Sequence, residues 1–392
     1  MDATAIIAGA GPAGLAAAAL LGREGVKTIV VASAASDDPR TVALMQPSIQ
    51  LLKYLEVWPG TLAQQTSPLK KLRIIDDTGT LVSHADLEFD CKDVKLEAFG
   101  WNVPLGLLLP ELRAAAINYG VTFYNATVTE GVSTGDHISV TLSTGEILTA
   151  QIAIAADGAN SILRAAAGIT TANWSYDQTA IATSFAHGRS HNDISTEYHK
   201  HAGPFTTVPM PNGRSSLVWM ERPARASDIM DMSDRELAAE IQIGTHGSLG
   251  LISAIGPRKA FPMKGLTANH FAKNRVLLVG ESAHQVPPIG AQGLNMSMRD
   301  ASTACDLILG QADAGNDRIM SEYNSKRRAE VLPRQQVINL MNRSLLEGLL
   351  PMEAARALGL TALNMLPPLK RAVMQYGLAP SKNTPFSMRE AS

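Results

Sequence analysis

The order of hydrophobic and polar positions at the start of the chain predicts a strand, a helix and a second strand. Residues 4–8 form a short apolar run, and residues 9–14 form a glycine-rich loop. Residues 15–22 are rich in Ala and Leu, and residues 28–32 form a β-branched run. Two strands joined by one helix are typical of the beginning of a doubly wound parallel sheet, so the sequence predicts an α/β fold.

The middle of the chain has a different pattern, typical of antiparallel strands. Residues 72–75 and 80–83 flank a turn-rich segment at 76–79, and residues 138–142 and 147–149 flank another at 143–146, so both pairs predict hairpins. Four further candidate strands lie at residues 179–185, 195–198, 205–209 and 215–220. These runs predict a second, antiparallel domain.

The last third of the chain returns to the first pattern. Ser233 with Glu236 three residues later predicts a capping box at the start of a helix. Residues 275–279 form a buried-type strand, and the sequence after it is helical in pattern, beginning with residues 296–309. Because a strand of the first type reappears after the antiparallel region, we expect the first domain to be discontinuous.

Composition narrows the classes of function. Of the 392 residues, 45% are hydrophobic and 18% are charged, which excludes a disordered chain. The 34 basic and 36 acidic residues leave a net charge of −2, so we expect no nucleic-acid partner. Cys91 and Cys305 stand far apart, and His199 and His201 have no carboxylate or cysteine at a convincing spacing, so we expect neither a disulfide nor a metal site. No signal peptide or membrane span fits the apolar residues 3–21, which predicts a cytoplasmic protein.

The glycine loop carries the first chemical motif. Gly9, Gly11 and Gly14 follow a strand and open a helix, which is the context of a dinucleotide-binding fingerprint. Pro12 suits the first helical turn, where a missing N–H costs nothing. The acid that usually ends this fingerprint is absent, because Ala32 stands in its place.

Two later segments also combine a strand end with polar residues. In the first, an apolar strand runs into Asp157 and Gly158, and Arg164 follows on the next helix. A capping role for Asp157 is the alternative to a binding role. In the second, residues 276–279 run into a loop rich in Pro and Gly that feeds the helix at residue 296, whose N-terminus presents free N–H groups.

With these three motifs in this order, the chain resembles the single-component flavin-dependent aromatic hydroxylases, in particular the branch that hydroxylates ubiquinone precursors. Arg40 with residues 41–44, and the segments 356–360 and 366–370, resemble further parts of that branch. The resemblance implies FAD bound by Gly9, Gly11, Pro12, Ala13, Gly14, Ala32, Arg40, Val128, Asp157, Gly158, Arg164, Gly280, Glu281, Pro287, Gly290, Gln292, Gly293, Leu294 and Asn295.

The same resemblance implies the architecture. A discontinuous Rossmann-like FAD-binding domain comprises residues 1–70, 106–177 and 271–340. An inserted antiparallel β-sheet substrate domain comprises residues 71–105 and 178–270, and a helical C-terminal segment comprises residues 341–392.

The chemistry implied by the resemblance belongs to the flavin, which is reduced by NAD(P)H during a transient visit and then reacts with O2. The loop with Pro287 and Pro288 is expected beside the flavin. Pro288, Val218 and Met220 are expected to contact an aromatic or polyprenyl-phenol substrate. His284 resembles a structural residue of the motif rather than an acid or base.

Three positions depart from the family pattern, and they keep other functions open. Ala32 replaces the ribose-binding acid, Glu281 stands where Asp or Asn is usual, and Leu105 occupies a position that is often polar. The alternatives are an FAD-dependent reductase or epoxidase of an isoprenoid, and a non-catalytic relative that binds lipid or acts as a scaffold in quinone biosynthesis. The apolar helical pattern of residues 338–378 predicts either core packing or contact with the inner membrane or with a biosynthetic complex. A homodimer is the oligomeric state that we expect.

Overall fold

The first sheet has a parallel centre. The computed structural model describes residues 1–392 except 35–37, 80–85, 347–358, 360, 379–383 and 391–392. β1 (Ala3–Ala8) lies between β2 (Thr28–Val31) and β11 (Ile147–Ala155), and β8 (Thr122–Tyr124) and β19 (Val276–Leu278) extend the sheet, all in parallel. β9 (Val128–Ser133), β10 (Ile138–Leu142) and β18 (Ala272–Lys273) are antiparallel additions. The pairing of β10 with β11 confirms the second predicted hairpin.

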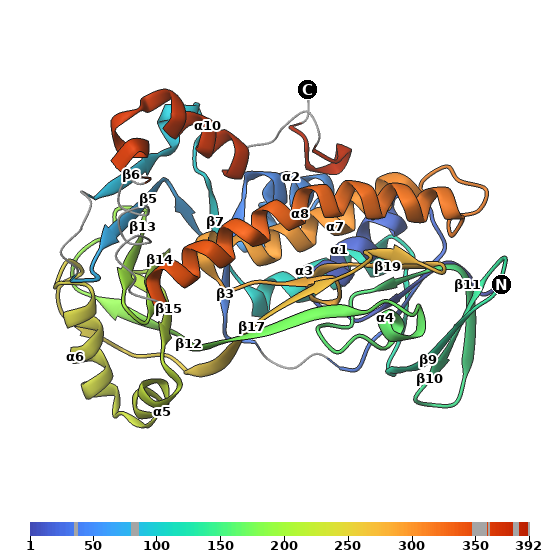
Figure 1. The fold of residues 1–392 in the computed structure, drawn as a ribbon, viewed down its shortest axis with the longest axis horizontal. Helices are drawn as coiled ribbons and strands as arrows, with labels where there is room; N and C mark the ends of the chain where they lie inside the picture. The colour runs from blue at the N-terminus through green and yellow to red at the C-terminus, as the bar shows by residue number, and fades with distance from the viewer. Residues whose placement is uncertain (35–37, 80–85, 347–358, 360, 379–383, 391–392) are drawn as a thin grey trace.

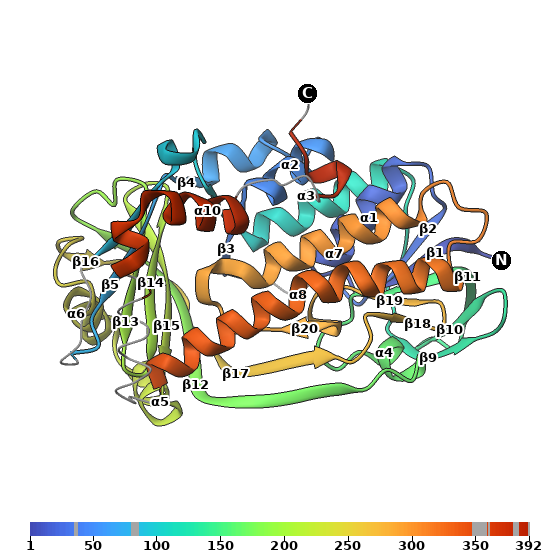
Figure 2. The ribbon, with the colours of Figure 1, turned by 45° about the horizontal axis from the view of Figure 1, so that its top comes forward.

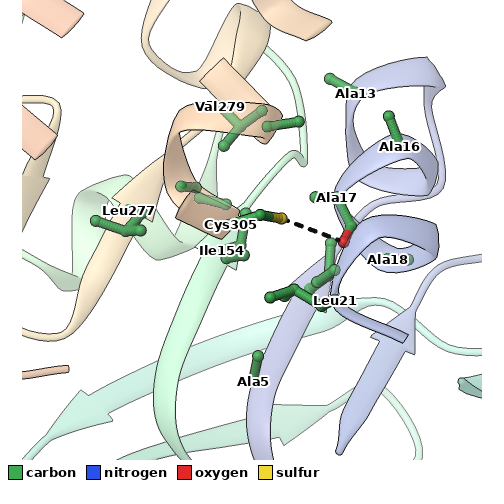
Figure 3. Packing of buried hydrophobic residues seen from close by; sticks show 14 of the residues in the cluster. Ala5, Ala13, Ala16, Ala17, Ala18, Leu21, Ile154, Leu277, Val279 and Cys305 are labelled. Atoms are coloured by element: carbon green, nitrogen blue, oxygen red, sulfur yellow. Dashed lines mark hydrogen bonds between the residues drawn. The ribbon is translucent and has the colours of Figure 1, made fainter. Parts of the chain in front are cut away.

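Helices cover this sheet, and small side chains set their spacing. α1 (Pro12–Arg23), α3 (Leu105–Asn118) and α7 (Gln292–Ile308) lie side by side, and α8 (Asp317–Leu346) runs along α7 (Figure 2). Figure 3 shows that α1 presents a row of alanines where α7 crosses it, and the Cys305 thiol lies 3.8 Å from the carbonyl oxygen of Ala17. Since the distance between helices depends on the side chains at the contact, this row allows α7 to lie close to α1.

The second sheet is largely antiparallel and carries the predicted strands. Its order is β20 (His284–Gln285), β17 (Lys259–Ala268), β12 (Thr171–His187), β15 (Arg214–Glu221), β14 (Gly203–Met210), β13 (Ile194–Lys200), β5 (Lys71–Asp76) and β6 (Leu87–Asp90), with β16 (Ile252–Ser253) paired to β12. Figure 1 shows β12 and β17 extending from this sheet toward α4 (Ile162–Ala166). β5 pairs with β6, whereas residues 80–83, expected as its partner, lie outside the described residues.

α5 (Pro223–Asp231) and α6 (Asp234–Gly244) bury apolar residues in the core of the second sheet. The capping box predicted at Ser233 is confirmed, because its hydroxyl accepts from the Glu236 N–H and its own N–H donates to the Glu236 carboxylate. The α/β fold with an inserted antiparallel sheet is thus confirmed.

A small third sheet completes the structure. It contains β3 (Thr41–Met45), β7 (Gly100–Pro104) and β4 (Ser67–Leu69), and α2 (Gln46–Tyr54) follows β3 directly. Short helical turns are η1 (Gly60–Gln65), η2 (Cys91–Val94), η3 (Gly280–Ser282), η4 (Ile289–Ala291) and η5 (Phe386–Met388). α10 (Pro367–Leu378) belongs to the expected helical C-terminal segment, whereas residues 356–358 and 360 lie outside the described part. None of the helices within the described residues is both long and apolar enough to cross a bilayer.

The strands can be compared with the domain ranges expected from the sequence, and the third sheet combines strands of two of these ranges, since β7 lies in 71–105 whereas β3 and β4 lie in 1–70. All strands of the first sheet fall in the ranges 1–70, 106–177 and 271–340. Two strands of the second sheet depart from the proposed ranges: β12 begins at Thr171, before the proposed boundary at residue 177, and β20 lies in the range 271–340. Both strands pair with β17 in the second sheet.

Candidate cofactor and substrate site

The three glycines of the first motif differ in how much space surrounds the position of a Cβ atom. Gly9 has a φ of +101°, and a Cβ there would lie 2.3 Å from the carbonyl oxygen of Ala156 at the end of β11. A Cβ on Gly14 would lie 2.2 Å from the carbonyl oxygen of Gly9. By contrast, a Cβ on Gly11 would have no atom within 4 Å. Gly9 and Gly14 are therefore needed for packing, whereas Gly11 faces open space that a phosphate group could approach.

The start of α1 suits an anion. Gly11 has extended backbone angles and precedes Pro12, the first helical residue, and Ala13 follows within the first turn. The first turn holds no acidic side chain. Because the first N–H groups of a helix lack partners within it and carry partial positive charge, this end favours a negatively charged ligand.

The second motif ties two parts of the site together. Asp157 accepts the N–H of Ile162 at 2.9 Å and so caps α4, as the capping alternative expects, while Gly158 has a φ of +82°. The second carboxylate oxygen of Asp157, Oδ1, is buried and has no hydrogen-bond partner among the described residues. Arg164 donates to the carbonyl oxygens of Ser282 at 3.0 Å and Ala159 at 2.7 Å. Its guanidinium thus connects the second motif to the third, and burial lowers its pKa.

The third motif forms the loop between β19 and α7. Gly280 has a φ of +68° and lies against Ser297, while Glu281 is exposed. Pro288 lines the cavity described below, whereas Pro287 is buried. Gly290 and Ala291 both have positive φ values, 61° and 54°, and turn the chain into α7. The first turn of α7 contains Gln292, whose side-chain amide donates to the Gly290 carbonyl at 3.0 Å, followed by Gly293 and Leu294.

The side-chain amide of Asn295 forms hydrogen bonds with three neighbouring segments. Its Oδ1 accepts from the Met45 N–H at 2.9 Å and the Ser48 hydroxyl at 2.7 Å. Its Nδ2 donates to the carbonyl oxygens of Ala43 at 2.9 Å and Ala291 at 2.7 Å. The amide therefore fastens the start of α7 to β3 and α2, which leaves the backbone of Asn295 as its means of contacting a cofactor.

Arg40 lies at the edge of the site with its charge partly compensated. Its Nε donates to the Asp38 carboxylate at 2.9 Å, and its guanidinium carbon lies 4.9 Å from the ring centre of Phe261. The pKa of Arg40 is raised, mainly by this hydrogen bond and with a contribution from the charge of Glu281. Asp38 is not among the site residues predicted from the sequence, and only the structure shows its pairing with Arg40.

Two residues expected to contact the cofactor, Ala32 and Val128, lie at the ends of strands of the first sheet. Ala32 follows β2, and its N–H donates to the Tyr124 carbonyl at 3.1 Å. Val128 begins β9 and is buried in the first core. Leu105, noted as a departure from the family, is buried at the start of α3, where its N–H donates to the Arg40 carbonyl at 2.9 Å.

One cavity of about 1080 Å³ brings these elements together with the second sheet. On the cofactor side its lining includes Arg40, Arg164, Glu281 and Pro288, and on the sheet side it includes Val218. Met220, expected beside Val218, is fully buried and lies outside the lining. Of the residues predicted to contact substrate, two therefore line the cavity.

The charge of the cavity fits a phosphorylated cofactor. Its charged lining residues are four cations, Arg40, Arg164, Lys259 and Lys264, and a single carboxylate, Glu281. Together with the open space at Gly11 and the N-terminus of α1, this set fits the pyrophosphate of FAD. Lys259 and Lys264 of β17, and Trp174 of β12, lie in no motif and in none of the predicted strands, so sequence reasoning missed them.

Comparison with known proteins agrees with this geometry. The chain is 29% identical to the ubiquinone hydroxylase UbiL of Rhodospirillum rubrum, covering 97% of this chain and 90% of the relative. It is 28% identical to the 3-demethoxyubiquinol 3-hydroxylase of Escherichia coli, covering 95% and 97%.

Solved structures share the fold. The p-nitrophenol 4-monooxygenase PnpA of Pseudomonas putida matches with a TM-score of 0.76 at 19% identity, covering 97% of this chain and 99% of that one. The flavin-dependent monooxygenase PieE, solved with FAD and substrate, matches with a TM-score of 0.70 at 19% identity, covering 97% and 73%.

The match to a family model decides the cofactor. The model described as an FAD binding domain matches residues 2–335, which include all three motifs and both large sheets. The resemblance inferred from the motifs is confirmed, and the chain belongs to the FAD-binding domain family of flavin-dependent monooxygenases, with FAD as its cofactor.

Proposed function

We propose that this protein is an FAD-dependent monooxygenase that uses NAD(P)H and O2 to hydroxylate the ring of a polyprenylated phenol in ubiquinone biosynthesis. The observation that carries this proposal is the shared cavity, which is bordered by Arg40 and by residues of the second and third motifs on one side and by β12, β15 and β17 on the other. A ring bound against the sheet would therefore lie next to the cofactor. The named hydroxylases to which the chain is similar over almost its whole length support the same reaction.

The residues of the first domain have the task of holding FAD, which supplies the redox chemistry when it is bound. The open backbone at Gly11, the first turn of α1 and the cations of the cavity would bind the pyrophosphate. Asp157 offers a buried, unpartnered oxygen among the described residues for a polar group of a ligand. The N-terminus of α7 places backbone N–H groups beside the Pro-rich loop, where they would favour negative charge by up to about 2 kcal/mol.

The residues of the second sheet have the task of binding the ring and excluding water. Val218, Leu217 and Ala180 contribute apolar surface to the cavity, and Phe261 and Pro288 lie in the same lining. An apolar wall with a few polar groups suits a phenol that carries a hydrocarbon tail. Exclusion of water from this space would limit side reactions of the bound cofactor with solvent.

The first experiment is the visible absorption spectrum of the purified protein, followed by titration with FAD. Flavin bands that are released in stoichiometric amount on denaturation, and NADPH-dependent O2 uptake with a prenylated phenol, are the expected results. Mass spectrometry of the product should show one added oxygen on the ring. An added oxygen on the isoprenoid tail, or a reduced tail, would instead favour the epoxidase or reductase alternative. A protein that ignores FAD would refute the proposal and favour the scaffold.

We further propose that α10 contacts an anionic lipid surface from which the tailed substrate reaches the cavity. Met365 and Leu366, directly before α10, and Leu369 and Val373 within it are exposed, from 43% for the last two to 73% for Met365. On the other side, Met374 is buried in a cluster that also contacts Ala291 of the third motif. Lys370 and Arg371 are the charged residues between positions 361 and 378, so the segment that bears the exposed apolar side chains carries only positive charge.

Co-sedimentation with vesicles tests this contact. The protein should bind vesicles that contain an anionic phospholipid and bind purely zwitterionic vesicles less. Replacing Leu369 and Val373 with Ser should weaken the binding, whereas Ile243→Ser, at another exposed apolar residue on α6, should leave it unchanged. Equal binding by both variants would exclude α10 as the contact.

A further inference from the structure

A fully buried carboxylate lies behind the loop of the third motif. Asp300, in the middle of α7, has no exposed surface. Its Oδ2 accepts the N–H of Gly280 at 2.9 Å and lies 2.7 Å from Nε2 of His284. Gly280 and His284 flank Glu281, which lines the cavity. One carboxylate oxygen therefore fixes both ends of the short segment that presents Glu281 to the cavity.

The carboxylate is kept charged by a partner on a neighbouring helix. Its Oδ1 accepts from Nε of Arg327 of α8 at 2.7 Å, and Arg327 is itself buried and also contacts Glu330. Burial opposes the charge of Asp300, but His284 and Arg327 hold its pKa below the usual range. Removal of one partner of a buried ion pair leaves the other charge uncompensated, so the pair acts as a unit.

His284 depends on Asp300 for its orientation. Its ring is 2% exposed, and Nδ1 has no hydrogen-bond partner among the described residues. The hydrogen bond to Asp300 thus orients the ring, which also lies beside the ring of Phe271, with 6.0 Å between centroids. The backbone of His284 and Gln285 pairs with β17 and leads to Pro287 and Pro288.

We propose that Asp300 is a positioning residue for the cofactor: through Gly280 and His284 it holds the loop with Glu281 in the conformation that binds FAD. Asp300 has no surface in the cavity and therefore acts through these two contacts rather than on the ligand. The inference rests on the proposed flavin function. It differs from a purely structural role, because it predicts a loss of FAD affinity beyond any loss of fold stability.

The test is the dissociation constant for FAD, measured by quenching of flavin fluorescence, with the flavin absorption spectrum as a second readout. Asp300→Asn retains the size of the side chain. In one orientation its NH2 group faces Nε of Arg327, and in the other it faces the N–H of Gly280, so a donor meets a donor in both cases. We expect its dissociation constant to rise at least about tenfold, because a buried donor or acceptor is left unsatisfied. The bands of bound flavin should shift as well.

A matched pair of variants covers the case in which Asp300→Asn does not fold. His284→Gln keeps an N–H near the position of Nε2 and should retain wild-type affinity, whereas His284→Leu removes the donor and should bind FAD about tenfold more weakly. Asp306→Asn is the control, because Asp306 is also a largely buried acid of α7, but its carboxylate accepts from the Phe386 N–H near the C-terminus. Its affinity for FAD should not change.

The outcomes separate the two proposals. If the wild-type protein binds no FAD, the proposed function fails. If the wild-type protein binds FAD and the Asp300 and His284→Leu variants bind it equally well, with only a lower unfolding temperature, Asp300 is a stability residue and the inference is overturned.

Discussion

Substitution of the three glycines of the first motif should affect fold stability at two positions and cofactor binding at the third. Gly9→Ala and Gly14→Ala place a methyl group against backbone atoms, at 2.3 Å from the Ala156 carbonyl oxygen and 2.2 Å from the Gly9 carbonyl oxygen. Gly11→Ala places one in space that no protein atom within 4 Å fills. The same chemical change should therefore have opposite consequences at neighbouring positions.

The magnitudes follow from these contacts. Gly9→Ala forces a residue with a Cβ into a φ of +101°, which costs about 1–2 kcal/mol, and overpacking adds about 1–3 kcal/mol. Gly14→Ala gains up to about 1 kcal/mol of helix propensity and loses a similar or larger amount to overpacking. Gly11 has a φ of −70°, which Ala adopts freely, so the stability of the apoprotein should stay within about 1 kcal/mol of wild type.

Gly11→Ala, which should barely change the stability of the apoprotein, should weaken FAD binding. A methyl group at the point where the pyrophosphate approaches should raise the dissociation constant at least about tenfold, equivalent to about 1.4 kcal/mol. Urea unfolding of the apoproteins and FAD titration of each variant measure the two effects separately. If Gly11→Ala bound FAD like wild type, or unfolded as easily as Gly9→Ala, the assignment of the open space to the cofactor would be wrong.

Three further predictions concern single positions. Burial raises the pKa of Asp306, so its ionised form destabilises the fold above that pKa and the cost disappears as the pH falls below the ordinary value of 3.8. Asp306→Asn should therefore raise Tm by about 1–3 °C at pH 7 and leave it unchanged at pH 3, and an equal rise at both values would contradict this cause. Ala32→Glu should tighten FAD binding severalfold in a titration, by adding an acceptor for ribose hydroxyls at the end of β2; unchanged affinity would indicate another anchoring mode. Val218→Phe should raise KM for the phenol in steady-state assays and leave FAD binding unchanged, whereas Met220→Leu, outside the cavity, should change neither quantity. Equal effects of the two variants on KM would show that the substrate does not bind against Val218.

The sequence by itself determined the features that depend on neighbouring residues. The strand, glycine turn and helix at residues 4–22 have local requirements for φ and close packing, and the motif displays them directly. The capping box at Ser233 and the hairpin of β10 and β11 are likewise formed by residues close in the chain. The fold class followed from such local patterns, whereas FAD followed from the resemblance of the three ordered motifs to a known family.

Only the tertiary structure decided which distant groups meet. Asn295 and Arg164 form hydrogen bonds with Met45 and Ser282, residues 250 and 118 positions away, and Asp300 meets Arg327 through the packing of α7 on α8. Val218 and Met220 share one face of β15, yet Val218 lines the cavity and Met220 is buried outside the lining. Such contacts depend on strand order, helix packing and the shape of the space between sheets, which no local pattern of residue types encodes.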